Sequence, residues 1–154
     1  DNASTSCEFA WHLKMAAGGS LRPATRVTVD QKMHYVYQNG KKVFKHAVSG
    51  MADVSAEIIG RNNLSDQDVA CLIPHQANLR IIDAAAKKLR LAPEQVIINI
   101  NKYGNTTAAT IPLAMSEAYS NGKLKKGDWI VTSAFGAGFT WGSLLFKWAM
   151  EERA

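Results

Sequence analysis

Two segments of the sequence place uncharged hydrogen-bond donors where a strand pattern gives way to a helix pattern. His75 follows the apolar run at residues 69–73, and Asn105 precedes a second stretch with helical spacing. A neutral imidazole near a helix N-terminus can donate one N–H to a developing oxyanion. The carboxamide of Asn105 is an uncharged double donor suited to an enolate or thioester oxygen. The pair predicts an oxyanion-binding site, although a structural histidine and an N-capping asparagine would also explain the two residues.

A third candidate segment is glycine-rich and runs from Phe135 through Gly136, Ala137 and Gly138. Small residues allow backbone N–H groups to approach a ligand closely. The segment is not a dinucleotide-binding fingerprint, because an apolar strand pattern follows it instead of a helix. A plain glycine-rich hairpin is the alternative interpretation.

The elements that must position these residues alternate between strand and helix patterns. Apolar spacing predicts a helix over 44–58, strands over 69–73 and 96–100, helices over 76–90 and 107–119, and strands over 129–135 and 140–148. From residue 69 onward the order is β-α-β-α-β-β, which predicts an α/β domain with a mixed β-sheet and layered helices. Three helices would cover only part of that sheet, which leaves a face for a partner domain.

The first part of the chain gives weaker signals. Residues 1–40 are expected to form an irregular or extended lead-in to an α/β core at 41–154, with a loop at Gly18-Gly19-Ser20. Apolar residues at odd positions from Val27 to Tyr37 predict extended structure, and Asn39-Gly40 predicts a turn.

Composition excludes several classes of protein. With 154 residues, 47% hydrophobic and 20% charged, the chain has the make-up of one globular domain. It contains no apolar run of the ~18 residues that a membrane span needs. Cys7 and Cys71 lack metal-ligand spacing, so we expect no metal site. The net charge of +5 suits an acidic partner, whereas nothing in the motifs favours nucleic acid.

Three motifs, in order, carry a family resemblance: PHQANLRII, NKYGNTTAATIP and FGAGFTWGS. Together they resemble the C-terminal half of β-ketoacyl-acyl-carrier-protein synthase III, the condensing enzyme that initiates bacterial fatty-acid synthesis. The resemblance implies a thiolase-like half, a cytoplasmic location and a homodimer. It also implies acyl-CoA and malonyl-acyl-carrier protein as substrates and no cofactor, since the CoA thioester is itself a substrate. A nucleophilic cysteine would take the acyl group and then condense it with the malonyl unit, with release of CO2.

The resemblance assigns a role to each matching residue. His75 and Asn105 would donate hydrogen bonds to the malonyl thioester oxygen and so stabilise the enolate left by decarboxylation. Asn78 and Phe44 would line the pantetheine tunnel, Phe135 would lie beside the acyl pocket, and the loop of Gly136, Ala137 and Gly138 would supply a backbone oxyanion donor. The residues expected to dock the acidic carrier protein are Gln76, Arg80, Lys87, Lys88 and Lys45.

Two departures from the family pattern stand out. Ala137 replaces a common glycine, which requires a backbone conformation that accepts a Cβ. No segment matches the surroundings of the nucleophilic cysteine, since Cys71 lies in an apolar run and Cys7 in a polar one. We therefore expect the half of the enzyme that carries the nucleophile to be absent from this chain, which has no initiator Met and would be inactive alone.

Three other interpretations remain open from the sequence. The chain could belong to a related Cys-His-Asn condensing enzyme of secondary metabolism with another acyl starter. It could be a non-catalytic module that docks a carrier protein. A nucleic-acid binder is the third.

Overall fold

The apolar run after residue 68 forms a strand with both faces covered. In strand β4 (Val69–Pro74), Cys71 and Ile73 pack against one layer of helix and Leu72 against the other. Successive side chains of a strand point to opposite faces, so a continuous apolar run is what a strand between two layers requires. The structure is a computed structural model that describes residues 1–151.

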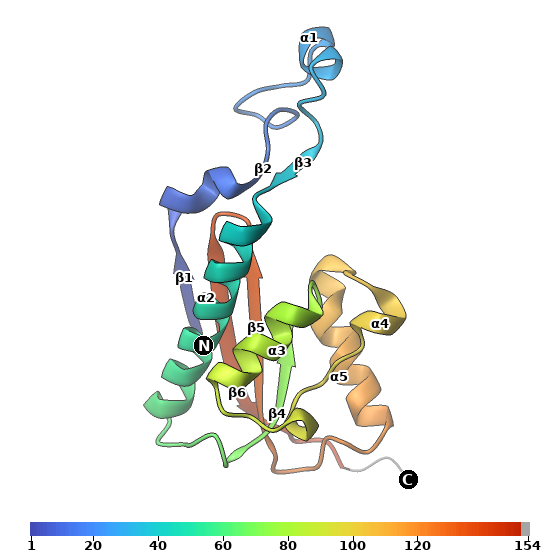
Figure 1. Cartoon of the computed structure of the whole chain (residues 1–154). Helices are drawn as coiled ribbons and strands as arrows, with labels where there is room; N and C mark the ends of the chain where they lie inside the picture. The colour runs from blue at the N-terminus through green and yellow to red at the C-terminus, as the bar shows by residue number, and fades with distance from the viewer. Residues whose placement is uncertain (152–154) are drawn as a thin grey trace.

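The elements follow the order drawn in Figure 1. The strands are β1 (Asn2–Thr5), β2 (Leu13–Met15), β3 (Val36–Gln38), β4, β5 (Trp129–Gly136) and β6 (Thr140–Lys147). The α-helices are α1 (Arg26–Asp30), α2 (Gly40–Arg61), α3 (Leu79–Lys88), α4 (Ile100–Tyr103) and α5 (Thr110–Ser120). Short 3-10 helices lie at η1 (Cys7–His12), η2 (Pro93–Gln95) and η3 (Thr107–Ala109).

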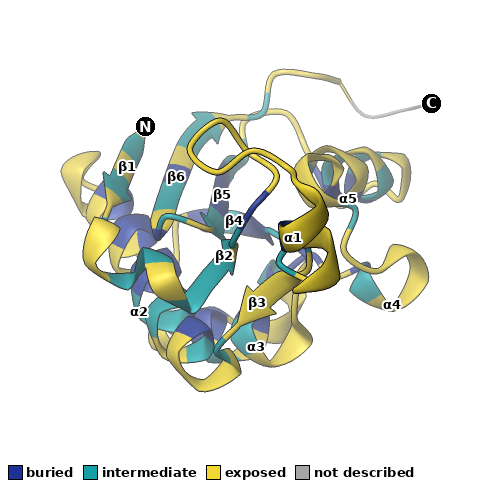
Figure 2. Ribbon diagram, turned by 90° about the horizontal axis from the view of Figure 1, so that it is seen from above, coloured by how far each residue is buried: buried dark blue, intermediate teal, exposed yellow. Residues whose placement is uncertain are grey.

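The main sheet has the strand order β1-β6-β5-β4 and is mixed, as predicted. Strands β4 and β5 are parallel, whereas β5–β6 and β6–β1 are antiparallel. Helices α2 and α3 lie on one side of this sheet and α5 lies on the other (Figure 2). The Leu144 side chain on β6 is about half exposed, so the helices do not cover the sheet completely.

Helices α2 and α5 and strands β4, β5 and β6 confirm the sequence prediction. Helix α2 covers the predicted range 44–58 and ends at Arg61, with Asn62 as its C-cap. Pro112 lies in the first turn of α5, where its missing N–H costs nothing. Helix α3 begins at Leu79, three residues later than predicted, because Asn78 caps it by accepting a bond from the Arg80 N–H.

The predicted strand at 96–100 is wrong. Val96 forms a single parallel bridge to Leu72, and the Ile97 N–H donates to the Leu72 carbonyl at 2.9 Å. Beyond that point the N–H groups of Asn99 and Ile100 turn to the side chain of Gln76, and helix α4 begins. A side-chain acceptor therefore ends the strand pairing after one step.

Two predictions for the lead-in are also wrong. Residues 26–30 form α1 instead of extended structure, because Thr25 and Thr28 cap the helix reciprocally. The turn predicted at Asn39-Gly40 is instead the start of α2, where the Asn39 side chain accepts from the Lys42 N–H at 3.2 Å. Strand β1 was not predicted either, and its four residues form an edge strand on β6.

Strands β2 and β3 pair with each other and carry α1 away from the main sheet (Figure 1). We name residues 13–38 the arm. Its large apolar side chains are mostly exposed, among them Leu21, Val27, Val29, Tyr35 and Val36. An exposed apolar surface of this kind is typical of a region that packs against another polypeptide.

Gly50 is the point of closest approach between α2 and the sheet. A Cβ built there would lie 2.9 Å from Trp141 Cγ, whereas a Cβ at Gly60 on the same helix would meet nothing within 4 Å. We expect Gly50→Ala to lower the free energy of unfolding by about 1–3 kcal/mol, because the indole ring must move. Gly60→Ala is the matched control and should raise that free energy by roughly 0.5–1 kcal/mol. Urea denaturation followed by circular dichroism measures both; equal effects would contradict the close packing.

Candidate active site

A pocket of about 470 Å³ opens where the strands of the main sheet end and meet the α5 layer. His75, Asn105, Phe135 and Gly136 from the sequence-based candidates line it together. The remaining lining residues are Ala3, Thr107, Ala108, Ala134, Thr140, Trp141 and Gly142. Each of the strands of the main sheet therefore contributes to one site, either directly or through the residue that follows it.

His75 is held in place at the end of β4. Its backbone N–H donates to the Ser133 carbonyl at 2.7 Å, which continues the parallel pairing with β5. Its ring Nδ1 lies 2.6 Å from the Thr110 hydroxyl at the start of α5. Burial lowers the pKa of His75 below its usual value, since desolvation disfavours the charged imidazolium. The ring is therefore a neutral group at pH 7, as the oxyanion hypothesis requires.

Asn105 is oriented by the turn in which it lies. Gly104, at a φ of +65°, ends α4 and turns the chain toward the pocket. The Asn105 Oδ1 atom accepts a bond from the Thr107 N–H at 2.9 Å. Because the oxygen already accepts a hydrogen bond from the backbone, the Nδ2 amino group is the part of the carboxamide that can donate to a ligand. The turn-stabilising role and the donor role are thus compatible in one residue.

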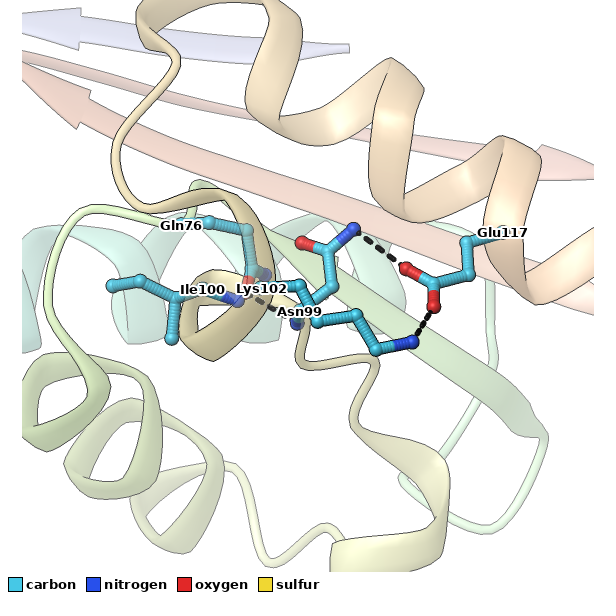
Figure 3. A network of polar contacts seen from close by, with 5 residues as sticks. All are labelled: Gln76, Asn99, Ile100, Lys102 and Glu117. Atoms are coloured by element: carbon cyan, nitrogen blue, oxygen red, sulfur yellow. Dashed lines mark hydrogen bonds and ion pairs between the residues drawn. The ribbon is translucent and has the colours of Figure 1, made fainter.

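Gln76 connects the end of β4 to the start of α4, and Figure 3 shows its side chain beside Asn99 and Ile100. Its Oε1 accepts from the N–H groups of Asn99 and Ile100 at 3.0 and 3.1 Å. Its Nε2 donates to the carbonyls of Pro74 and Ile97 at 2.8 and 3.1 Å. All four bonds of the carboxamide are made while the residue is 0% exposed. The prediction that Gln76 docks a carrier protein is therefore wrong; it fixes the end of β4 to the start of α4.

The network continues outward from Asn99. The Asn99 side chain donates to Glu117 of α5 at 3.1 Å, and Lys102 of α4 forms an ion pair with the same carboxylate. The hydrogen bond from Lys102 lowers the pKa of Glu117. These contacts connect α4, which leads to Asn105, with the body of α5.

Phe44 and Asn78 lie in a second pocket of about 380 Å³, not in the pocket of His75. Arg80 and Lys41 also line it, and the Arg80 guanidinium lies 5.5 Å from the centre of the Phe44 ring. The structure thus groups the two residues predicted for pantetheine and adds positive charge beside them.

The other residues predicted to dock a carrier protein are exposed on α2 and α3. Lys45 and Lys87 are solvent-exposed, whereas Lys88 Nζ pairs with Asp53 Oδ1 at 2.6 Å. The positive charge of Lys88 is therefore partly compensated by its neighbour.

Only Gly136 of the predicted oxyanion loop lines the pocket. Ala137 and Gly138 form the turn between β5 and β6. Ala137 avoids the positive φ that would penalise a Cβ, so this departure from the family pattern is tolerated. Phe135 stacks on Trp141 with a centroid distance of 6.2 Å and forms an apolar wall.

The contributions of Ala3, Thr107, Thr110 and Trp141 to this site were not predicted from the sequence. Trp141 lies in the third motif, FGAGFTWGS, but the family resemblance assigns it no role. Thr107 has a φ of +54°, which is rare for a β-branched residue, and no local sequence signal indicates it.

Neither cysteine lies in the pocket. Cys71 is buried beside α5, and desolvation raises the pKa of its thiol to about 11. Cys7 is exposed on η1. Within residues 1–151, no group of His, Cys, Asp and Glu side chains is arranged to hold a metal ion, and none of the helices there has the length and apolarity to cross a membrane.

This sheet with its helices is that of the thiolase-like proteins. A crystal structure of 3-oxoacyl-(acyl carrier protein) synthase III from Pseudomonas aeruginosa superposes with a TM-score of 0.85 at 35% identity, covering 97% of this chain and 44% of that one. The priming β-ketosynthase of the R1128 polyketide pathway superposes with a TM-score of 0.77 at 27% identity, covering 94% of this chain and 43% of that one.

Sequence comparison identifies the family. The model of the 3-oxoacyl-[acyl-carrier-protein] synthase III C-terminal domain matches residues 59–148. A β-ketoacyl-[acyl-carrier-protein] synthase III from Chlorobium phaeobacteroides is 56% identical over 137 residues, which cover 89% of this chain and 42% of the relative. The chain belongs to this C-terminal family, and it spans less than half the length of that relative.

The difference between the two cysteines can be tested by alkylation. At pH 8 in the folded chain, iodoacetamide should modify Cys7 and leave Cys71 unmodified, because the Cys71 thiol is buried and its pKa is about 11. Both should react in denaturant. Mass spectrometry of tryptic peptides reads the outcome, and rapid native labelling of Cys71 would show that it is a reactive thiol.

Proposed function

We propose that this chain is the half of a 3-oxoacyl-acyl-carrier-protein synthase III that decarboxylates the malonyl unit and stabilises its enolate. The whole protein would condense acetyl-CoA or a similar acyl-CoA with malonyl-acyl-carrier protein at the start of fatty-acid synthesis. The observation that carries this proposal is the shared pocket of His75 and Asn105, both uncharged and both held by hydrogen bonds.

The reaction needs donors at the thioester oxygen and no base. When the bond between the malonyl α-carbon and its carboxylate breaks, CO2 leaves and the electron pair moves into an enolate. The negative charge on the thioester oxygen is then stabilised by an N–H of His75 and an N–H of Asn105. The enolate carbon attacks the acyl thioester on the nucleophilic cysteine, a C–C bond forms, and the cysteine leaves as a thiolate.

The nucleophile would come from polypeptide that these 154 residues do not include. Cys71 is buried and has a raised pKa, and Cys7 lies outside the pocket. The longer relatives have room for a second half that carries the cysteine. The exposed apolar side chains of the arm give such a half, or the partner subunit of a homodimer, a surface to cover. A cytoplasmic location belongs to the same proposal.

The similarity to a priming ketosynthase of a polyketide pathway supports a second candidate, with the same chemistry on another acyl starter. Turnover of the whole protein with acetyl-CoA and with longer acyl-CoA substrates separates the two. A docking module without catalysis is less well supported, because it gives no reason for oriented donors in the pocket.

The roles of the two donors predict a split phenotype. In the whole protein, His75→Ala and Asn105→Ala should each lower malonyl decarboxylation by about 10²–10³-fold, the cost of losing an oxyanion donor. Transfer of the acyl group from acyl-CoA to the cysteine should remain largely intact. Release of ¹⁴CO2 and labelling of the enzyme by ¹⁴C-acetyl-CoA measure the two steps separately. Equal loss of both steps would contradict the assigned roles.

Charge reversal tests the docking surface. Lys87→Glu should raise KM for malonyl-acyl-carrier protein roughly tenfold and leave acyl-CoA loading unchanged, because Lys87 is exposed on α3 where a docked protein can contact it and does not line the pocket of Phe44 and Asn78. Lys123→Glu is the matched control, since Lys123 lies in the turn after α5 beside Cys71, away from α3. If Lys123→Glu raises KM for malonyl-acyl-carrier protein as much as Lys87→Glu does, the effect comes from the net charge of the protein and the docking surface is contradicted.

A further inference from the structure

The ring of His75 can serve as a donor only if its single proton is on the nitrogen that faces the pocket. A neutral imidazole carries one N–H, on Nδ1 or on Nε2. Since Nδ1 lies 2.6 Å from the Thr110 hydroxyl, Nε2 is the nitrogen available to a substrate. Thr110 is only 2% exposed, so water does not compete for this contact.

The Thr110 hydroxyl has two candidate acceptors and one proton. The Thr107 carbonyl lies 3.0 Å from Thr110 Oγ1, and His75 Nδ1 lies 2.6 Å from it. If the hydroxyl proton points at Thr107, Nδ1 must carry the ring proton and Nε2 is left with a lone pair. If the hydroxyl proton points at Nδ1, the ring proton is on Nε2.

The electrostatics of the site favour the second arrangement. Thr110 is the first residue of α5, an 11-residue helix whose N-terminus carries partial positive charge. A lone pair on Nδ1 is stabilised by that charge, whereas an N–H aimed at it is repelled. The shorter of the two hydroxyl distances is also the one to Nδ1.

We propose that Thr110 is a positioning residue that donates its hydroxyl proton to His75 Nδ1 and thereby places the ring proton on Nε2, facing the substrate. This inference rests on the proposed function, since it matters for catalysis only if His75 donates to the malonyl thioester. The turn at 107–110 would then act on both donors, because the Thr107 N–H orients the carboxamide of Asn105 and the Thr110 hydroxyl sets the tautomer of His75.

The tautomer can be measured directly in this chain. Nitrogen-15 NMR of histidine-labelled protein at pH 8 distinguishes a protonated ring nitrogen from one with a lone pair. We expect Nε2 of His75 to be protonated and Nδ1 to carry the lone pair. Thr110→Val, which keeps the shape and removes the hydroxyl, should move a substantial fraction of the proton to Nδ1, and Thr110→Ser should restore the wild-type pattern.

The arm offers a matched control. The Thr28 hydroxyl lies 3.0 Å from His34 Nε2, which is a second threonine–imidazole pair remote from the pocket. Thr28→Val should leave the His75 signals unchanged. A wild-type His75 with the proton on Nδ1 would overturn the proposal, as would a Thr110→Val variant with wild-type signals. If Thr110→Val does not fold, the wild-type tautomer and the Thr110→Ser variant still decide the question.

Kinetics of the whole protein provide the second readout. Thr110→Val should lower kcat for malonyl decarboxylation by about 10-fold or more, with KM for malonyl-acyl-carrier protein and acyl transfer unchanged, and Thr110→Ser should recover most of it. A wild-type protein that does not decarboxylate would contradict the proposed function, whereas the NMR result stands independently of it. An altered tautomer with unchanged kcat would overturn the positioning role.

Discussion

The buried carboxamide of Gln76 is the interaction on which the arrangement of the site depends. It replaces further strand pairing at the β4 edge with four hydrogen bonds to backbone groups on both sides of that edge. An unsatisfied buried amide would cost about 1–3 kcal/mol for each group left without a partner, so this geometry has little freedom. The distance between the end of β4 and the start of α4 is thereby fixed. Because His75 follows β4 directly and Asn105 follows the short helix α4, their relative positions depend on this distance.

Neutral donors define what the pocket can do. A lysine or arginine would bind the malonyl carboxylate more strongly than the enolate, which would stabilise the ground state and oppose decarboxylation. His75 is kept uncharged by burial, and Asn105 never carries charge. Both are oriented through their second polar atom, one by a hydroxyl and the other by a backbone N–H. In the proposed reaction, the fixed orientation of these two donors would direct them at the charge that develops on the thioester oxygen.

The elements that could be predicted are those whose signal is local and periodic. Helix α2 and strands β4 to β6 follow directly from apolar spacing. The site candidates adjoin such periodic elements: His75 follows one, Phe135 lies at the end of one and Asn105 precedes one. The apolar run at 96–100 failed as a strand because the side chain of Gln76, far away in the sequence, captures its N–H groups. The docking role that the resemblance implies for Gln76 is wrong because its side chain is buried by hydrogen bonds to partners distant in sequence. The positive φ of Thr107 and the contact of Thr110 with His75 are likewise set by tertiary structure and leave no mark on local composition.

The backbone segments that carry His75 and Asn105 differ in how easily they open. His75 follows β4, whose residues from Cys71 to Pro74 are buried and pair with β5, so opening of this segment requires disruption of the core. Asn105 lies in an exposed turn between the four-residue helix α4 and the three-residue η3, where brief local opening needs little free energy. Under the proposed function, we therefore expect adjustment of the pocket to substrates of different size to occur at Asn105, while the backbone of His75 stays fixed.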